Sequence, residues 1–111
     1  MPLVTESMLQ AAFDYLNTQG ETAAQARADL IIAEHRKKQC RARLILASSR
    51  GSAGLREAEA DSSKEYEQAF LVEAEAAQRV EWHRHQKSRS DAILAAWRTQ
   101  ESSARELTKI R

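Results

Sequence analysis

The sequence contains few of the residues that break helices. Three glycines and one proline, Pro2, occur among 111 residues. That is too few for the regularly spaced turns of a β-sandwich or β-barrel. Alanine supplies 20 residues, and Glu, Leu, Lys, Arg and Gln are also frequent. This composition is typical of an all-α protein.

Cysteine and long hydrophobic runs are also scarce. Cys40 is the only cysteine, so an intrachain disulfide is impossible. The longest apolar runs, residues 30–33 and 44–47, are far too short to cross a membrane. The N-terminal residues lack the basic and apolar regions of a signal peptide. Together these features predict a soluble cytoplasmic protein.

The motifs of catalysis and metal binding are missing from the sequence. It has no G-x-S-x-G motif, no glycine-rich phosphate loop and no Cys/His pair at a known spacing. His83 and His85 are two residues apart, so a regular helix would point them about 200° apart. We therefore expect no catalytic residue, no metal site and no cofactor.

Hydrophobic spacing predicts a first helix over residues 5–17. Thr5 or Ser7 is suited to cap its start, and Gly20 to close it in the left-handed conformation. The positions that share one apolar face are Leu9, Ala12, Phe13 and Leu16.

A second helix is predicted over residues 22–48, starting with a capping box formed by Thr22 and Gln25. Ile31, Ile32, Ile45 and Leu46 widen its apolar stripe, which suggests contact with more than one neighbour. Steps of four and three, typical of a coiled coil, connect Ala26, Leu30, Ala33, Lys37, Cys40, Leu44 and Ala47.

A third helix is predicted over residues 55–111, after a Ser/Gly-rich turn at residues 48–54. Ser62 and Ser63 favour a kink near its start. A polar segment, residues 83–91, interrupts its apolar stripe. The predicted fold is one domain, residues 1–111, with a short N-terminal helix packed on a long, coiled-coil-like antiparallel helical hairpin.

Charge is segregated along the chain although the formal net charge is only +1. Residues 21–50 and 82–111 are basic, and residues 55–81 are acidic. In the predicted hairpin, the basic residues 36–43 lie opposite residues 61–68, which contain Asp61, Glu65 and Glu67. We therefore expect intramolecular ion pairs in the hairpin.

The C-terminal basic block has no acidic partner in this arrangement. Cations with interleaved aromatic residues suit nucleic acid, preferably single-stranded, because unpaired bases stack on exposed rings. Trp82 lies off the apolar stripe and is the expected stacking residue, whereas Trp97 is expected to be buried. The expected phosphate contacts are Arg84, Lys87, Arg89 and Arg98.

A helix that extends beyond its partner leaves Ile93, Leu94 and Trp97 uncovered. Exposed apolar residues at helical spacing mark interfaces, and a symmetric dimer is the simplest closed assembly. These three residues are therefore the expected interface of a homodimer.

Residues 49–60, Ser63–Tyr66 and Ala96–Arg98 carry a family resemblance. Residues 45–98 resemble small helical proteins of unknown function that tailed bacteriophages encode, often among replication and recombination genes. The shared features are a short Ser/Gly turn, an Arg-Glu-Ala helix start, a tyrosine and a Trp-Arg pair. The resemblance implies a phage origin and the cytoplasm of a bacterial host, but no known activity.

Two functions remain open from the sequence. The first is a non-enzymatic phage accessory protein of DNA replication or recombination, which binds nucleic acid or a DNA-processing protein. The alternative is a helical interaction protein that inhibits or recruits a host protein, such as a defence protein, through its acidic residues 57–81. That alternative requires exposed carboxylates, which pairing within the hairpin would partly occupy.

Overall fold

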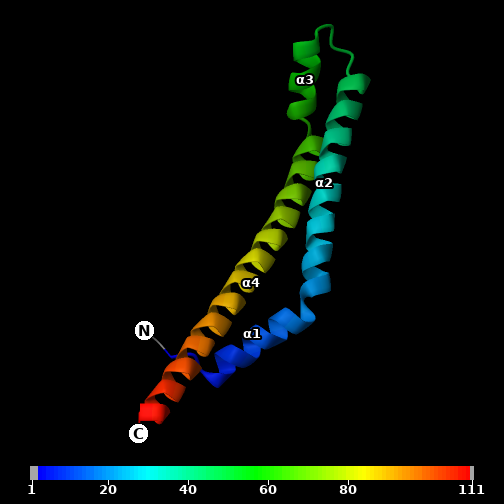
Figure 1. The fold of residues 1–111 in the computed structure, drawn as a ribbon. Helices are drawn as coiled ribbons and strands as arrows, with labels where there is room; N and C mark the ends of the chain where they lie inside the picture. The colour runs from blue at the N-terminus through cyan, green and yellow to red at the C-terminus, as the bar shows by residue number, and fades with distance from the viewer. Residues whose placement is uncertain (1–2, 111) are drawn as a thin grey trace. The chain divides into compact units, whose positions relative to one another are not determined.

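The computed structural model describes residues 3–110 and confirms the all-α fold. Its helices are α1 (Glu6–Thr18), α2 (Gly20–Ala47), α3 (Ala53–Asp61) and α4 (Lys64–Ile110) (Figure 1). The short N-terminal helix and the long antiparallel hairpin are both present, as predicted. The predicted end of the third helix, Arg111, lies outside the described residues.

The described residues divide into two compact units. Residues 24–81 form the hairpin unit, which contains most of α2, all of α3 and the first part of α4. Residues 3–23 and 82–110 form the terminal unit, in which α1 accompanies the rest of α4.

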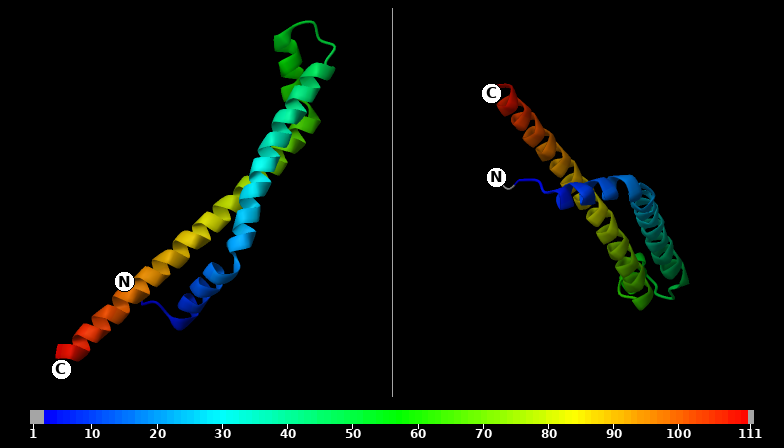
Figure 2. Two further views of the ribbon diagram at one scale, coloured as in Figure 1. Left: turned by 45° about the vertical axis from the view of Figure 1, so that its right-hand side comes forward. Right: turned by 90° about the horizontal axis from the view of Figure 1, so that it is seen from below.

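The hairpin unit is built on the predicted coiled-coil spacing. In it α2 runs antiparallel to the first part of α4, and the two helices lie side by side (Figures 1 and 2). Of the predicted α2 stripe, Ala47 alone is exposed. The α4 residues that are buried or half-buried at matching steps are Tyr66, Ala69, Glu73, Ala76 and Val80.

The connection in the hairpin unit contains a complete helix break, where the sequence predicts a kink. Ser52 caps α3 by accepting a 3.2 Å hydrogen bond from the backbone N–H of Leu55, as expected. After α3 ends at Asp61, the Ser63 hydroxyl accepts a 3.1 Å bond from the N–H of Tyr66 in the first turn of α4. Ser63 thus caps the start of a new helix. Its hydroxyl accepts from a backbone N–H that would bond to a backbone carbonyl if the preceding helix continued.

The junction between α1 and α2 differs from the prediction in two ways. Thr5 caps α1 through the N–H of Met8, at 3.1 Å, as expected. Gly20, however, is the first residue of α2, and no described glycine has a positive φ. The predicted capping box is also wrong, because Thr22 lies inside α2. The carbonyl of Gln19 already accepts the N–H of Ala23, at 2.9 Å.

In the terminal unit α1 lies against α4. Ala12 is buried, and a small cavity of about 80 Å³ between the helices is lined by Met8, Tyr15, Ser90 and Ile93, among others. Before the start of α1, the backbone N–H of Val4 donates a 3.1 Å hydrogen bond to Oε1 of Gln100 in α4. Packing and hydrogen bonding therefore hold the N-terminal segment to α4.

Candidate nucleic-acid interface

Ion pairs within the hairpin unit occupy several of the cations in residues 36–43. Arg41 lies 2.7 Å from Asp61, and Arg43 lies 3.0 Å from Glu65, both within the acidic stretch that the sequence predicts. The expected intramolecular pairing is therefore confirmed for these residues. Hydrogen bonding and charge attraction from Asp61 also raise the pKa of Arg41.

Lys37 makes the most sheltered of these pairs. Its Nζ lies 2.7 Å from Oε2 of Glu73, and both side chains are less than a quarter exposed. Glu73 falls outside residues 61–68, so this pair lies farther along α4 than the sequence predicts. The hydrogen bond to Glu73 raises the pKa of Lys37 above its ordinary value of 10.5, against the lowering effect of desolvation. The ammonium also lies 5.7 Å from the centre of the Phe70 ring.

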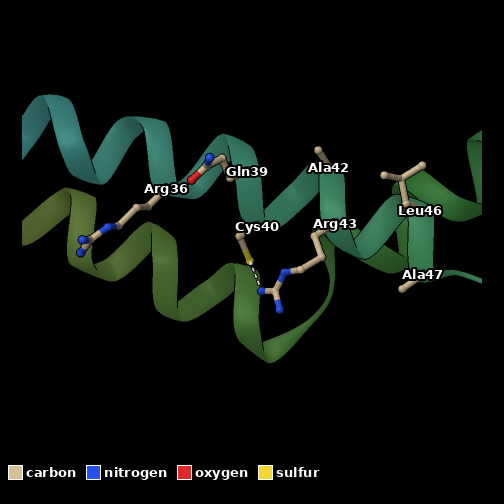
Figure 3. A pocket seen from close by; sticks show the side chains of 7 residues that line it. All are labelled: Arg36, Gln39, Cys40, Ala42, Arg43, Leu46 and Ala47. Atoms are coloured by element: carbon tan, nitrogen blue, oxygen red, sulfur yellow. Dashed lines mark hydrogen bonds between the residues drawn. The ribbon is translucent and has the colours of Figure 1, made fainter.

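Arg36 and Arg43 border a shallow hollow on α2 (Figure 3). Arg43 turns towards Cys40, with 3.9 Å between its Nη2 and the cysteine Sγ. Leu46 in the same hollow is 85% exposed. The side chains that line it all come from α2 and combine apolar groups with the cations Arg36 and Arg43.

The positive charge of the molecule is concentrated in the C-terminal segment. The hairpin unit, residues 24–81, contains ten basic and ten acidic residues. Residues 82–111 contain seven basic and three acidic residues. Because the hairpin unit is neutral and its ion pairs are internal, the C-terminal segment has the main excess of cations.

One side of α4 brings together three of the expected phosphate contacts. Steps of three and four residues place side chains on the same side of a helix. Lys87 pairs with Asp91 at 2.9 Å, but both side chains are more than half exposed. Arg98 and Arg105 are exposed on the same side. The stripe, called the basic stripe below, consists of Arg84, Lys87, Asp91, Leu94, Arg98, Glu101 and Arg105.

Trp82 and Arg89 lie on a different side of α4. At about 100° per residue, Trp82 is about 140° from Lys87 and about 160° from Arg98 around the helix axis. Arg89 lies seven residues after Trp82 and therefore on nearly the same side as Trp82. The structure thus separates the expected stacking residue from the phosphate contacts of the basic stripe.

Trp82 belongs to a cluster of three rings that connects α4 with α1. Trp82 is 52% exposed, and the sequence predicts it to be exposed. The ring meets His83 edge-on with 4.8 Å between centroids, and Tyr15 with 6.2 Å. The Tyr15 hydroxyl lies 3.0 Å from Nδ1 of His83. Sequence reasoning missed His83, which is only 8% exposed.

The polar segment 83–91 interrupts the apolar pattern of α4 but not its buried stripe. His83 and Ser90 are buried, and Gln86 is half-buried. These positions continue the steps of three and four from Ala76 and Val80. A search of the sequence for steps of three and four residues, with polar residues allowed, would have identified these buried positions.

The three residues expected at a dimer interface are all half-buried within the terminal unit. Ile93 lines the small cavity shared with Met8 and Tyr15 of α1. α1 thus covers part of the stripe that the sequence left without a partner. Trp97, which the sequence predicts to be buried, is half-buried in the terminal unit.

The described residues provide two further observations on function. Residues 3–110 contain no cluster of His, Cys, Asp and Glu side chains arranged to hold a metal ion. Among the described helices, none combines the length and apolar character needed to cross a membrane. No protein-family model, curated protein or solved structure matches the chain.

Proposed function

We propose that the protein is a non-enzymatic nucleic-acid-binding protein that contacts phosphates through the basic stripe of α4. The observation that supports this most directly is the common side shared by Lys87, Arg98 and Arg105, all exposed. Cations at successive turns of one helix can follow a phosphate backbone and release its counterions. The phage resemblance supports a role of this activity in DNA replication or recombination.

The proposed contact involves the phosphate backbone more than the bases. The stripe also contains Asp91 and Glu101, which reduce its attraction for phosphate. Trp82 lies across the helix from Lys87 and Arg98, so a strand on the stripe does not reach its ring directly. We therefore expect micromolar affinity with little preference among sequences.

The structure offers less support for recognition of a protein through residues 57–81. Asp61, Glu65 and Glu73 pair with cations of α2. Glu59 likewise pairs with Arg50, at 3.2 Å. Carboxylates engaged in this way present less negative charge to a partner.

A salt titration tests the proposal. Binding of labelled single-stranded and duplex oligonucleotides is followed by fluorescence anisotropy between about 50 and 200 mM salt. The triple variant Lys87→Ala, Arg98→Ala and Arg105→Ala should weaken binding and reduce the salt slope by up to about three units.

A matched control removes three exposed cations from the hairpin unit: Arg27→Ala, Lys38→Ala and Lys64→Ala. The net charge changes equally, so equal losses in both triple variants would contradict a localised stripe. Absence of binding to either strand form at low salt would reject nucleic acid and favour a protein partner.

A further inference from the structure

The hairpin unit leaves more large apolar side chains on its surface than in its core. Its buried hydrophobic residues are four alanines and Val80. No large side chain is fully buried in the described residues. Exposed instead, by 46% to 66%, are Ile31, Ile32, Leu55, Phe70, Leu71 and Val72, among others. Apolar surface of this extent is typical of a contact with another molecule.

Part of this surface forms a groove between α2 and α4. The groove has a volume of about 300 Å³. Ile32 and Ala33 of α2 line it together with Val72 and Ala76 of α4. Three charged side chains also line it: Asp29, Arg36 and Arg79.

The charges on α2 identify a suitable occupant. Asp29 and Arg36 are seven residues apart, so two helical turns bring them to the same side of α2. Ile32 and Ala33 lie midway between them. A two-fold axis through this midpoint would place Asp29 of each copy opposite Arg36 of the other. Symmetric dimers use such self-complementary surfaces, in which residue i contacts j and j contacts i.

We infer that this groove is the interface of a homodimer in which α2 packs antiparallel against α2 of a second copy. Ile32, which is 46% exposed, lies at the centre of the contact, Ala33 forms the floor of the groove, and two Asp29–Arg36 pairs flank the centre. This interface lies in the hairpin unit and differs from the Ile93, Leu94 and Trp97 interface that the sequence suggests.

Charge reversal tests the symmetry directly in the full-length chain. Asp29→Lys brings an ammonium group against the guanidinium of Arg36 in both pairs, and Arg36→Glu brings two carboxylates together in both pairs. Each variant alone should raise the dimer dissociation constant at least about tenfold, measured by sedimentation. An equimolar mixture of the two variants should restore dimers that contain one copy of each variant.

The mixed dimer contains one pair of unchanged Asp29 with unchanged Arg36 and one pair of the introduced ammonium with the introduced carboxylate. Both pairs are therefore attractive, whereas each variant paired with itself has two repulsive pairs. Dimers in the mixture would support the inference, because a misfolded variant would not be rescued by its partner. Failure of two correctly folded variants to form dimers together overturns it.

The control is a second pair with the same spacing, Arg27 and Glu34, which does not line the groove. Arg27→Glu and Glu34→Lys should leave the dissociation constant unchanged, and circular dichroism verifies the fold of every variant. A wild-type chain that stays monomeric at about 100 μM, a concentration at which even a weak dimer of this kind is populated, also overturns the inference.

Discussion

The hydroxyl of Tyr15 contacts His83 twice, at 3.0 Å from Nδ1 and at 2.9 Å from the backbone carbonyl oxygen. A phenol has one proton to donate. Both contacts are hydrogen bonds only if the hydroxyl donates to the carbonyl and Nδ1–H donates to the hydroxyl. The two contacts together therefore require a proton on Nδ1 of His83, and they fasten α1 to α4 across 68 positions of sequence.

Tyr15→Phe should reduce the free energy of unfolding by about 1–3 kcal/mol. The substitution keeps the ring but removes the partner of a buried imidazole N–H, and burying an unpaired donor is unfavourable. Urea unfolding followed by circular dichroism measures the change.

The control for this substitution is Tyr66→Phe in the hairpin unit. Tyr66 is half-buried, and its hydroxyl makes no hydrogen bond within residues 3–110. Its loss should change stability by less than about 0.5 kcal/mol. Equal effects of the two substitutions would show that the contact of Tyr15 with His83 contributes nothing of its own.

The two threonines near the helix starts should respond differently to the same substitution. Thr5→Ala removes the cap of α1 and should destabilise the protein by about 1 kcal/mol. Thr22→Ala replaces a residue inside α2 by a better helix former, so stability should stay the same or rise slightly. Thermal unfolding measures the stability of both variants. A larger loss of stability for Thr22→Ala than for Thr5→Ala would support the capping box that the sequence predicts.

Much of the hairpin could be predicted because its determinants are local or periodic. The steps of four and three identify the buried side of α2, including the half-buried Lys37 and Cys40. Ser62 and Ser63 mark the position of the helix break, although the sequence predicts only a kink there. Charge segregation predicts ion pairs between residues 36–43 and 61–68, and the pair of Arg41 with Asp61 is one of them.

The terminal unit was harder to predict because its contacts connect distant positions. The polarity of His83 and Ser90 makes residues 83–91 look like an interruption of the apolar stripe, although the spacing of these two residues continues the buried stripe. Buried polar groups are found where partners satisfy them, and the partner of His83 is Tyr15, whose position depends on the path of α1. For the candidate site, the sequence supplied the cations, but only the continuous helix shows that Trp82 and Lys87 lie on different sides.

The ion pair between Lys37 and Glu73 should stabilise the protein in a pH-dependent way. Because its folded-state pKa is raised, the contribution of Lys37 is complete below the unfolded value of 10.5 and declines as pH rises through the folded value. Glu73→Gln should therefore lower stability by up to about 1 kcal/mol near pH 8. The difference from wild type should shrink above about pH 11, as measured by urea unfolding.

A more exposed pair provides the comparison for Lys37. Arg43 and Glu65 are 68% and 61% exposed, so solvent screens their attraction. Glu65→Gln should change stability little at any pH between about 8 and 11. A difference that persists unchanged for Glu73→Gln at high pH would mean that packing of the carboxylate, and not the charge of Lys37, stabilises this site.

Trp82 separates two ways of binding nucleic acid. If strands follow the basic stripe, Trp82→Leu should affect single-stranded and duplex affinities equally and leave the salt slope unchanged, because the ring lies about 140° from Lys87 around the helix. If a strand instead crosses α4 and stacks on the exposed ring, the variant should lose about 1–3 kcal/mol with single strands alone. Anisotropy titrations with both strand forms decide between these modes.

Because the Trp82 ring also contacts Tyr15 and His83, circular dichroism must show that the variant retains its helices. A selective loss on single strands would contradict backbone contact along the stripe and would assign base recognition to the opposite side of α4.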